Sequence, residues 1–195
     1  RAPIFWASPA VPCPPLDLVG VRQTLSQGPR SGQTRVNHDS PGKLLRQAIS
    51  GGTIPIPGAF NALTGRMIEE LGFPAAYLSG AAFSAGAMAI PDIGLFTLNE
   101  LVAQVTLFTR QVRIPLVVDA DTGFGEAVNV ERTIVELEAV GAAAIQLEDQ
   151  RLPKRCGHLS GKALVERDEM CAKLRAAAGA RRDPDLVILG RTDAR

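Results

Sequence analysis

The sequence predicts an α/β fold of the (β/α)8 TIM-barrel kind, here truncated after about five strands. A strand-like segment followed by a helix-like segment recurs between residues 39 and 195. The strand-like segments are mostly continuous apolar runs, which is typical of parallel strands whose two faces are both covered. A complete barrel needs about 250 residues. We therefore expect the last three strands to be absent.

Polar side chains at the carboxyl ends of the strand-like segments favour a barrel over a doubly wound sheet. Ser79, Asp119, Glu148 and Arg191 all stand at such ends. Active sites of barrels collect side chains from several strand ends in this way. No Gly-x-Gly-x-x-Gly string follows the first strand-like run, so a dinucleotide-binding sheet has little support.

The order of elements follows from local start and stop signals. Ser40 and Pro41 form an N-cap and first turn, and Thr97 with Glu100 forms a capping box. Residues 75–90 indicate a buried strand and a loop. The predicted helices cover residues 41–50, 62–71, 98–112, 129–140 and 165–178, and the predicted strands cover residues 53–61, 75–80, 114–121, 142–149 and 185–193.

Composition excludes several classes of protein. The 195 residues carry 21 Lys and Arg against 20 Asp and Glu, a net charge of +1, which argues against a nucleic-acid partner. The sequence contains no run of ~18 apolar residues, which is the length that would predict a membrane span. The chain has three cysteines, Cys13, Cys156 and Cys171; a disulfide scaffold would need more cysteines and an even number of them. This favours the cytoplasm, or the mitochondrial matrix in a eukaryote.

Residues 1–38 differ from the rest of the chain. Six of the 14 prolines lie between Pro3 and Pro29, and four arginines face a single acid, Asp17. We expect a disordered leader outside the barrel, with residues 39–195 as the partial catalytic domain. Because the chain starts with Arg1 and stops just after a strand-like segment, we interpret it as a fragment.

Asp119 and Asp121 are the sharpest local signal for chemistry. Residues i and i+2 of a strand point to the same face, so their carboxylates converge at one end of the sheet. Two carboxylates in apolar surroundings repel unless a cation lies between them, and Mg²⁺ suits such oxygen ligands. Glu148 could complete the ligand set directly or through water. The alternative is structural: Asp119 is a cap, and Asp121 begins the turn TGFG.

The loop KRCGH at residues 154–158 is the second signal. A thiol flanked by basic side chains, here Cys156, suits proton transfer. Arg191 ends the fifth strand, where its guanidinium could bind a substrate carboxylate with two hydrogen bonds. The structural alternatives are a solvated basic loop with an incidental thiol, and an Arg191 that pairs with Asp193 or Glu148.

Taken together, the strings YLSGAAFSAG, PDIG, VVDADTGFG, QLEDQ, KRCGHLSGK and GRTDAR resemble the isocitrate lyase/phosphoenolpyruvate mutase superfamily. The resemblance runs from about residue 38 to residue 195 and is strongest to the short 2-methylisocitrate lyases. It implies a barrel of this superfamily's type and a Mg²⁺-dependent carbon–carbon lyase. Such an enzyme splits a tricarboxylate, 2-methylisocitrate, into pyruvate and succinate, and its full-length form is a homotetramer.

The resemblance also implies roles for individual residues. Cys156 would be the catalytic acid that protonates the succinate carbanion, in a loop with Lys154 and His158, and Tyr77 would assist proton handling. Relatives commonly have glycine where Ala81 stands. The substrate would contact Ser79, Gly80, Ala81, Cys156, Gly157 and Arg191, and Mg²⁺ would be held by Asp119 and Asp121 with Asp92 and Glu148 nearby.

Three alternatives stay open. Isocitrate lyase shares the Cys-Gly-His loop but usually carries a longer chain between the shared motifs. Relatives that cleave oxaloacetate or alkylmalates also keep such a loop. Finally, five strands alone leave an open sheet with unpaired edges, so the isolated chain is expected to fold poorly and to be an inactive fragment.

Overall fold

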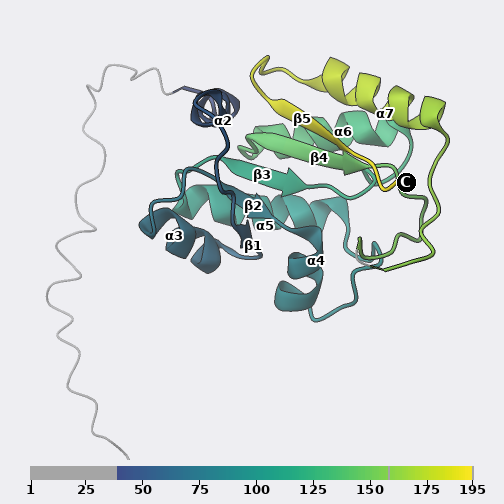
Figure 1. The fold of residues 1–195 in the computed structure, drawn as a ribbon, viewed down its shortest axis with the longest axis horizontal. Helices are drawn as coiled ribbons and strands as arrows, with labels where there is room; N and C mark the ends of the chain where they lie inside the picture. The colour runs from purple at the N-terminus through teal and green to yellow at the C-terminus, as the bar shows by residue number, and fades with distance from the viewer. Residues whose placement is uncertain (1–38, 158, 195) are drawn as a thin grey trace, which may run out of the picture. The chain divides into compact units, whose positions relative to one another are not determined.

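The computed structural model describes residues 39–157 and 159–194 (Figure 1). The predicted leader, residues 1–38, and the predicted site residue His158 lie outside the described residues. The strands are β1 Gly58–Ala59, β2 Ala76–Leu78, β3 Leu116–Asp119, β4 Ala144–Glu148 and β5 Val187–Arg191. The helices are α2 Pro41–Ser50, α3 Ala62–Glu70, α4 Gly80–Ala82, α5 Leu98–Gln111, α6 Ala127–Ala139 and α7 Arg167–Ala180, with a π-helical turn, η1, at Phe83–Ala87.

The five strands form one parallel sheet in the order β1-β2-β3-β4-β5. Because crossovers between neighbouring parallel strands are right-handed, a consecutive order places every connecting helix on the same face. The helices α3, α5, α6 and α7 accordingly pack side by side in that order, and Figure 1 shows α5 and α6 behind the strands. This is the winding of a barrel, so the predicted fold class is confirmed.

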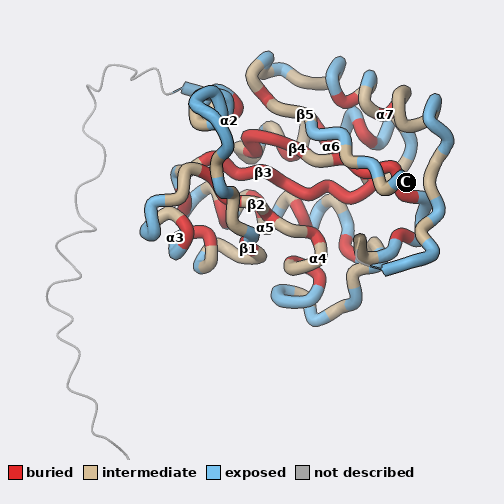
Figure 2. Tube along the Cα trace, in the orientation of Figure 1, coloured by how far each residue is buried: buried red, intermediate tan, exposed pale blue. Residues whose placement is uncertain are grey.

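One face of the sheet packs its apolar side chains against the helices, and the side chains of the opposite face lie in layers across the strands. On the helix side, Val118, Ile145 and Leu147 join a core with residues of α5, α6 and α7. On the other face, the register aligns Val117 with Ala144 and Val187, then Asp119 with Gln146 and Leu189, and then Glu148 with Arg191. The face therefore changes from apolar to charged towards the carboxyl ends, and Figure 2 shows how deeply β3 and β4 are buried.

Helix α2 covers the amino ends of the strands. Ser40 caps it by accepting a hydrogen bond from the Lys43 amide at 3.2 Å. Gly42 packs so closely on the chain before β5 that an added Cβ would lie 2.5 Å from the Asp185 carbonyl carbon. Leu45 joins Val117 and Ala144 in a second apolar cluster. The amino ends of the strands are thus covered by packed side chains, and the polar side chains lie at the carboxyl ends.

Two predicted segments differ from the structure. The loop expected after β2 is helical from Gly80 to Ala87, because Ser79 accepts a hydrogen bond from the Ala82 amide at 3.3 Å and so caps a run of small residues. The strand expected at residues 53–61 shrinks to Gly58–Ala59, since Pro55 and Pro57 cannot donate to a ladder. Within the described part of the chain, no helix is long and apolar enough to cross a membrane.

Candidate active site

A cavity of about 150 Å³ opens at the carboxyl ends of β2 to β5. Its lining brings together every predicted site residue except Gly80 and Asp121, which adjoin it, and His158, which lies outside the described residues. Arg155 lines the cavity too and was not predicted. The lining consists of Tyr77, Ser79, Ala81, Asp92, Asp119, Glu148, Lys154, Arg155, Cys156, Gly157 and Arg191.

Asp119 and Asp121 come together at one end of the sheet, as the sequence predicts, but beside the start of α4 and by a different geometry. Only Asp119 lies in a strand; Asp121 follows in a turn with a positive φ of 49°. The Gly80 amide donates to Asp119 Oδ2 at 3.2 Å. A Cβ at Gly80 would lie 3.1 Å from Asp121 Oδ1 and 3.3 Å from Asp119 Oδ2. Both carboxylates therefore face one backbone position where no side chain is present.

Lys154 brings a positive charge into this acidic group. Its side chain is only 4% exposed, and its ammonium pairs with Asp92 Oδ1 at 2.6 Å and with Asp121 Oδ1. Burial acts to lower the pKa of Lys154, but the two carboxylates outweigh it and hold the pKa above its usual range. Burial raises the pKa of Asp121 to about 6, helped by Asp119 and opposed by Lys154. Lys154 is therefore charged and offsets part of the repulsion.

Glu148 and Arg191 face each other from the ends of neighbouring strands. Arg191 Nη1 lies 3.5 Å from Glu148 Oε2, and Nη2 lies 3.5 Å from Asp193 Oδ1. Burial raises the pKa of Glu148 to about 7, with Asp119 and Asp121 adding to the effect against Lys154 and Arg191. Both partners foreseen for Arg191 are present, yet each lies at a long distance. Its guanidinium can therefore still bind a carboxylate from the cavity.

Tyr77 lies in the same cavity with its ionisation suppressed. Burial raises the pKa of the phenol well above its usual range, and the charge of Asp119 raises it further. The phenol consequently stays protonated at neutral pH. Tyr77 can donate a hydrogen bond to a bound anion, but it does not serve as a base there.

The chemistry of the donor set suits Mg²⁺. Four carboxyl groups, those of Asp92, Asp119, Asp121 and Glu148, gather beside the two basic side chains of Lys154 and Arg191. Among the described residues, no three acidic, thiol or imidazole groups are placed to ligate one ion together. Mg²⁺ commonly takes one or two carboxylates and keeps several waters. These residues fit such a water-rich site.

The sequence analysis did not identify three site residues that surround the loop at residues 154–158, called the cysteine loop from here on. They are Gln150, Lys162 and Asp193. Gln150 is 2% exposed, and its amide bonds Glu148, the Arg155 backbone and Asp193. Lys162 donates to the Gly157 carbonyl oxygen at 2.7 Å and to Asp193 at 2.9 Å. The only signal in the sequence was position: Gln150 follows the string QLED, Asp193 ends the string GRTD, and Lys162 ends the string KRCGHLSGK.

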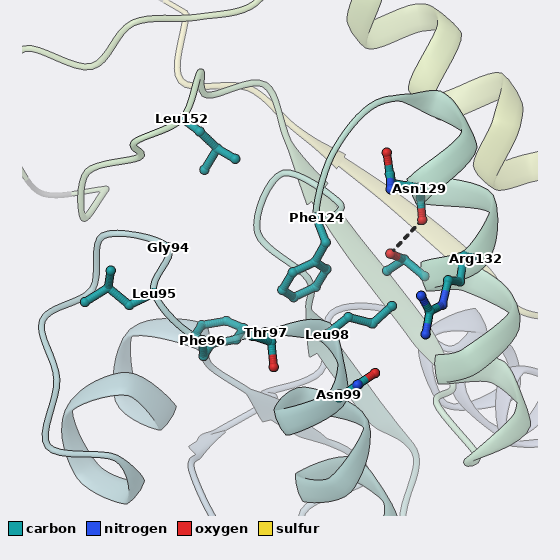
Figure 3. A pocket seen from close by; sticks show the side chains of 11 residues that line it. Gly94, Leu95, Phe96, Thr97, Leu98, Asn99, Phe124, Asn129, Arg132 and Leu152 are labelled. Carbon is teal, nitrogen blue, oxygen red and sulfur yellow. Dashed lines mark hydrogen bonds between the residues drawn. The ribbon is translucent and has the colours of Figure 1, made fainter.

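A larger cavity of about 430 Å³ lies between the start of α5 and α6 (Figure 3). Phe96 and Phe124 lie beside one another there with ring centroids 5.8 Å apart, and Leu152 and Arg132 complete the rim. Its lining holds no carboxylate or thiol. Of these two cavities, the smaller is the one that brings carboxyl groups, basic side chains and a thiol together.

The chain matches known proteins over most of the described residues. Residues 45–195 match the family described as phosphoenolpyruvate phosphomutase. A 2-methylisocitrate lyase of Aeropyrum pernix is 54% identical over 158 residues, which cover 80% of this chain and 50% of that protein. A 2,3-dimethylmalate lyase of Eubacterium barkeri is 48% identical over 139 residues, which cover 71% of this chain and 48% of that protein.

Solved structures agree with the sequence matches. A phosphonopyruvate hydrolase in complex with oxalate and Mg²⁺ superposes with a TM-score of 0.71 at 34% identity, over 80% of this chain and 53% of that one. The chain spans about half the length of the curated relatives it matches.

Proposed function

Because the chain belongs to the phosphoenolpyruvate mutase/isocitrate lyase superfamily, we propose that residues 39–195 are the part of a Mg²⁺-dependent carbon–carbon lyase that carries its acid and its acidic cluster. The proposed reaction cleaves 2-methylisocitrate into pyruvate and succinate. The observation that carries the proposal is one cavity lined by Cys156, Arg191 and the acidic side chains. The 54% identity to a 2-methylisocitrate lyase supports the choice of substrate.

The residues of the cavity divide the work of a retro-aldol cleavage. The substrate hydroxyl loses its proton, and its oxygen becomes the keto oxygen of pyruvate. The bond between the two carbons breaks, and its electron pair stays on the carbon beside the succinate carboxylate. Glu148 lines the cavity beside Arg191, and we assign to its carboxylate the role of accepting the hydroxyl proton. Cys156 donates the proton that the carbanion needs.

Charge and hydrogen bonds hold the substrate during this step. Arg191 binds a substrate carboxylate and stabilises negative charge next to the carbanion. Tyr77 and the start of α4 at Ser79, Gly80 and Ala81 provide neutral contacts. Mg²⁺, held by Asp119 and Asp121 with Asp92 nearby and Glu148 acting through water, would supply electrostatic stabilisation for charge that develops on the hydroxyl and its neighbouring carboxylate. Lys154 keeps Asp92 and Asp121 in place at the edge of that cluster.

The second candidate is cleavage of an alkylmalate, favoured by the 48% identity to a 2,3-dimethylmalate lyase. Both reactions break a carbon–carbon bond and leave a carbanion beside a carboxylate. They differ in the acid that remains bound. A substrate with three carboxylates needs one more cationic or hydrogen-bonding contact than a dicarboxylate does.

A substrate panel tests the proposal with purified protein at its natural length. Release of pyruvate, glyoxylate, propionate and oxalate is measured from 2-methylisocitrate, isocitrate, 2,3-dimethylmalate and oxaloacetate, with and without Mg²⁺. We expect the highest kcat/KM for 2-methylisocitrate and no turnover after chelation. If another acid has a higher kcat/KM, that acid and not 2-methylisocitrate is the preferred substrate. If the protein turns over none of the four acids, the proposed lyase activity is rejected. The homotetramer and the cytoplasmic location stay predictions, the first of which size-exclusion chromatography with light scattering tests.

A further inference from the structure

Two polar side chains hold the backbone on either side of Cys156. On one side, Gln150 Oε1 accepts from the Arg155 amide at 2.9 Å, and Nε2 donates to the Arg155 carbonyl oxygen at 3.0 Å. On the other side, the Lys162 ammonium donates to the Gly157 carbonyl oxygen at 2.7 Å. The backbone of both residues that flank Cys156, Arg155 and Gly157, is therefore held by side chains.

Both contacts meet at one carboxylate, that of Asp193 beyond the end of β5. Gln150 Nε2 donates to Asp193 Oδ2 at 3.0 Å, and Lys162 Nζ donates to Oδ1 at 2.9 Å. The Asp193 backbone is itself held, because its amide donates to Asp149 Oδ1 at 3.0 Å. These hydrogen bonds thus connect the cysteine loop to residues just beyond the ends of two strands, β4 and β5.

Burial makes these hydrogen bonds strong determinants of position. Gln150 is 2% exposed, and the side chains of Lys162 and Asp193 are 18% and 11% exposed. Little water can replace a lost partner of Gln150, so an alternative loop position would leave its buried amide unpaired. The anchor network, defined as Gln150, Lys162 and Asp193, therefore favours one arrangement of the loop over others.

We propose that the anchor network positions the thiol of Cys156 over the cavity, with Asp193 as the shared anchor of Gln150 and Lys162. None of the three residues lines the cavity, so we assign them as positioning residues. This inference rests on the proposed function for the role of Cys156 as an acid. It differs from a purely structural role in one respect: the network governs where the thiol lies, so loosening it changes thiol access and kcat beyond any loss of stability.

The test compares Gln150→Met and Lys162→Met with two matched controls. Gln104→Met also removes an amide that donates to a backbone carbonyl, that of Phe60 at 3.2 Å. Lys43→Met also removes a lysine paired with an aspartate, Asp39 at 2.7 Å. Neither control residue lines the cavity. The measurements are the rate of Cys156 alkylation by iodoacetamide, referred to that of Cys171 in the same sample, kcat and KM for 2-methylisocitrate, and the melting temperature.

We expect both anchor variants to raise the relative alkylation rate of Cys156 about tenfold, the factor that the loss of about one net hydrogen bond allows. We expect kcat of Lys162→Met to fall by up to about 100-fold, the cost of misplacing a reacting group by about 1 Å, with a smaller change in KM. Gln150→Met also removes the hydrogen bond to Glu148 Oε1 at 3.1 Å, so for this variant the alkylation ratio is the deciding measurement. The double variant should fall short of the product of the two single effects, because both contacts share Asp193. The two controls should leave alkylation and kcat unchanged.

An unchanged alkylation ratio in both anchor variants, or an equal rise in the controls, would overturn the inference. If Gln150→Met does not fold, Lys162→Met decides alone, since it alters a partly exposed side chain. If the wild-type protein cleaves no tricarboxylate, the proposed function fails, but the alkylation comparison still decides whether the network positions the thiol.

Discussion

Gly157 packs directly against the guanidinium of Arg191, so that a Cβ atom at position 157 would lie 2.3 Å from Arg191 Nη2. The cysteine loop and the end of β5 are therefore in contact through the backbone of one and the side chain of the other. No larger residue fits at position 157 unless the guanidinium moves away from Glu148 and Asp193.

Gly157→Ala should weaken substrate binding more than stability. The added methyl displaces the Arg191 guanidinium, which we assign to a substrate carboxylate, and a displaced charged hydrogen bond of about 1.5–3 kcal/mol corresponds to a fall of about 10- to 100-fold in kcat/KM. Steady-state kinetics check this. The control is Gly179→Ala in α7, where an added Cβ meets nothing within 4 Å. Unaltered kcat/KM in Gly157→Ala would contradict the contact.

Cys156→Ser should lower kcat by about 10²- to 10⁴-fold, since a serine hydroxyl is a far weaker acid and general acids contribute about that much. Mg²⁺ affinity, measured by calorimetry, should not change, because the thiol is not among the proposed ligands. Cys171→Ser is the matched control: Cys171 lies in α7 and lines no part of the cavity. An unaltered kcat in Cys156→Ser would remove the role of Cys156 as acid.

Stability should fall as the pH rises from about 5 to about 7. The pKa of Asp121 is raised to about 6 from 3.8, and that of Glu148 to about 7 from 4.5, so the folded state holds protons that the unfolded state releases. The contribution of Lys154, whose pKa is also raised, is constant across this window because the lysine is charged in both states. Melting temperature against pH measures the effect.

Mg²⁺ should raise the melting temperature more at the upper end of that window than at the lower end. At high pH the acidic side chains are ionised and bind the cation, whereas at low pH protons compete with it. Glu148→Gln should flatten the upper part of the pH curve, and Glu131→Gln on the exposed face of α6 should not. An equal Mg²⁺ effect at both ends would argue against binding at these carboxylates.

Gly42→Ala should destabilise the fold by about 1–3 kcal/mol, the usual cost of overpacking. The methyl group would meet backbone atoms of Asp185 and Leu186 at 2.5–2.7 Å, and backbone cannot turn aside as a side chain can. Urea denaturation gives the free energy of unfolding. Gly51→Ala at the end of the same helix, where nothing lies within 4 Å, is the control. Equal stability of the two variants would show that α2 does not pack against the start of β5.

Local patterns in the sequence predicted most elements because they act within one segment. The capping pairs at Ser40 and at Thr97 with Glu100 begin helices where expected, and the apolar runs around Val117 and Ile145 form buried strands. The predictions were wrong where a local contact changes the backbone without a strong signal in composition. Ser79, read as the end of a strand, also caps a helical turn.

The sequence by itself determined the class of fold and the edge of the sheet at which polar side chains gather, because apolar periodicity and strand direction place Asp119, Glu148 and Arg191 at one end. It also offered Asp193 and Glu148 as partners of Arg191, and both contacts are present. The tertiary structure alone decided the other pairs. Lys154 binds Asp121, which is 33 positions away, and Gln150 binds Asp193, which is 43 positions away. Such contacts depend on the register between strands and on the path of the loop, and no pattern within a single segment encodes either.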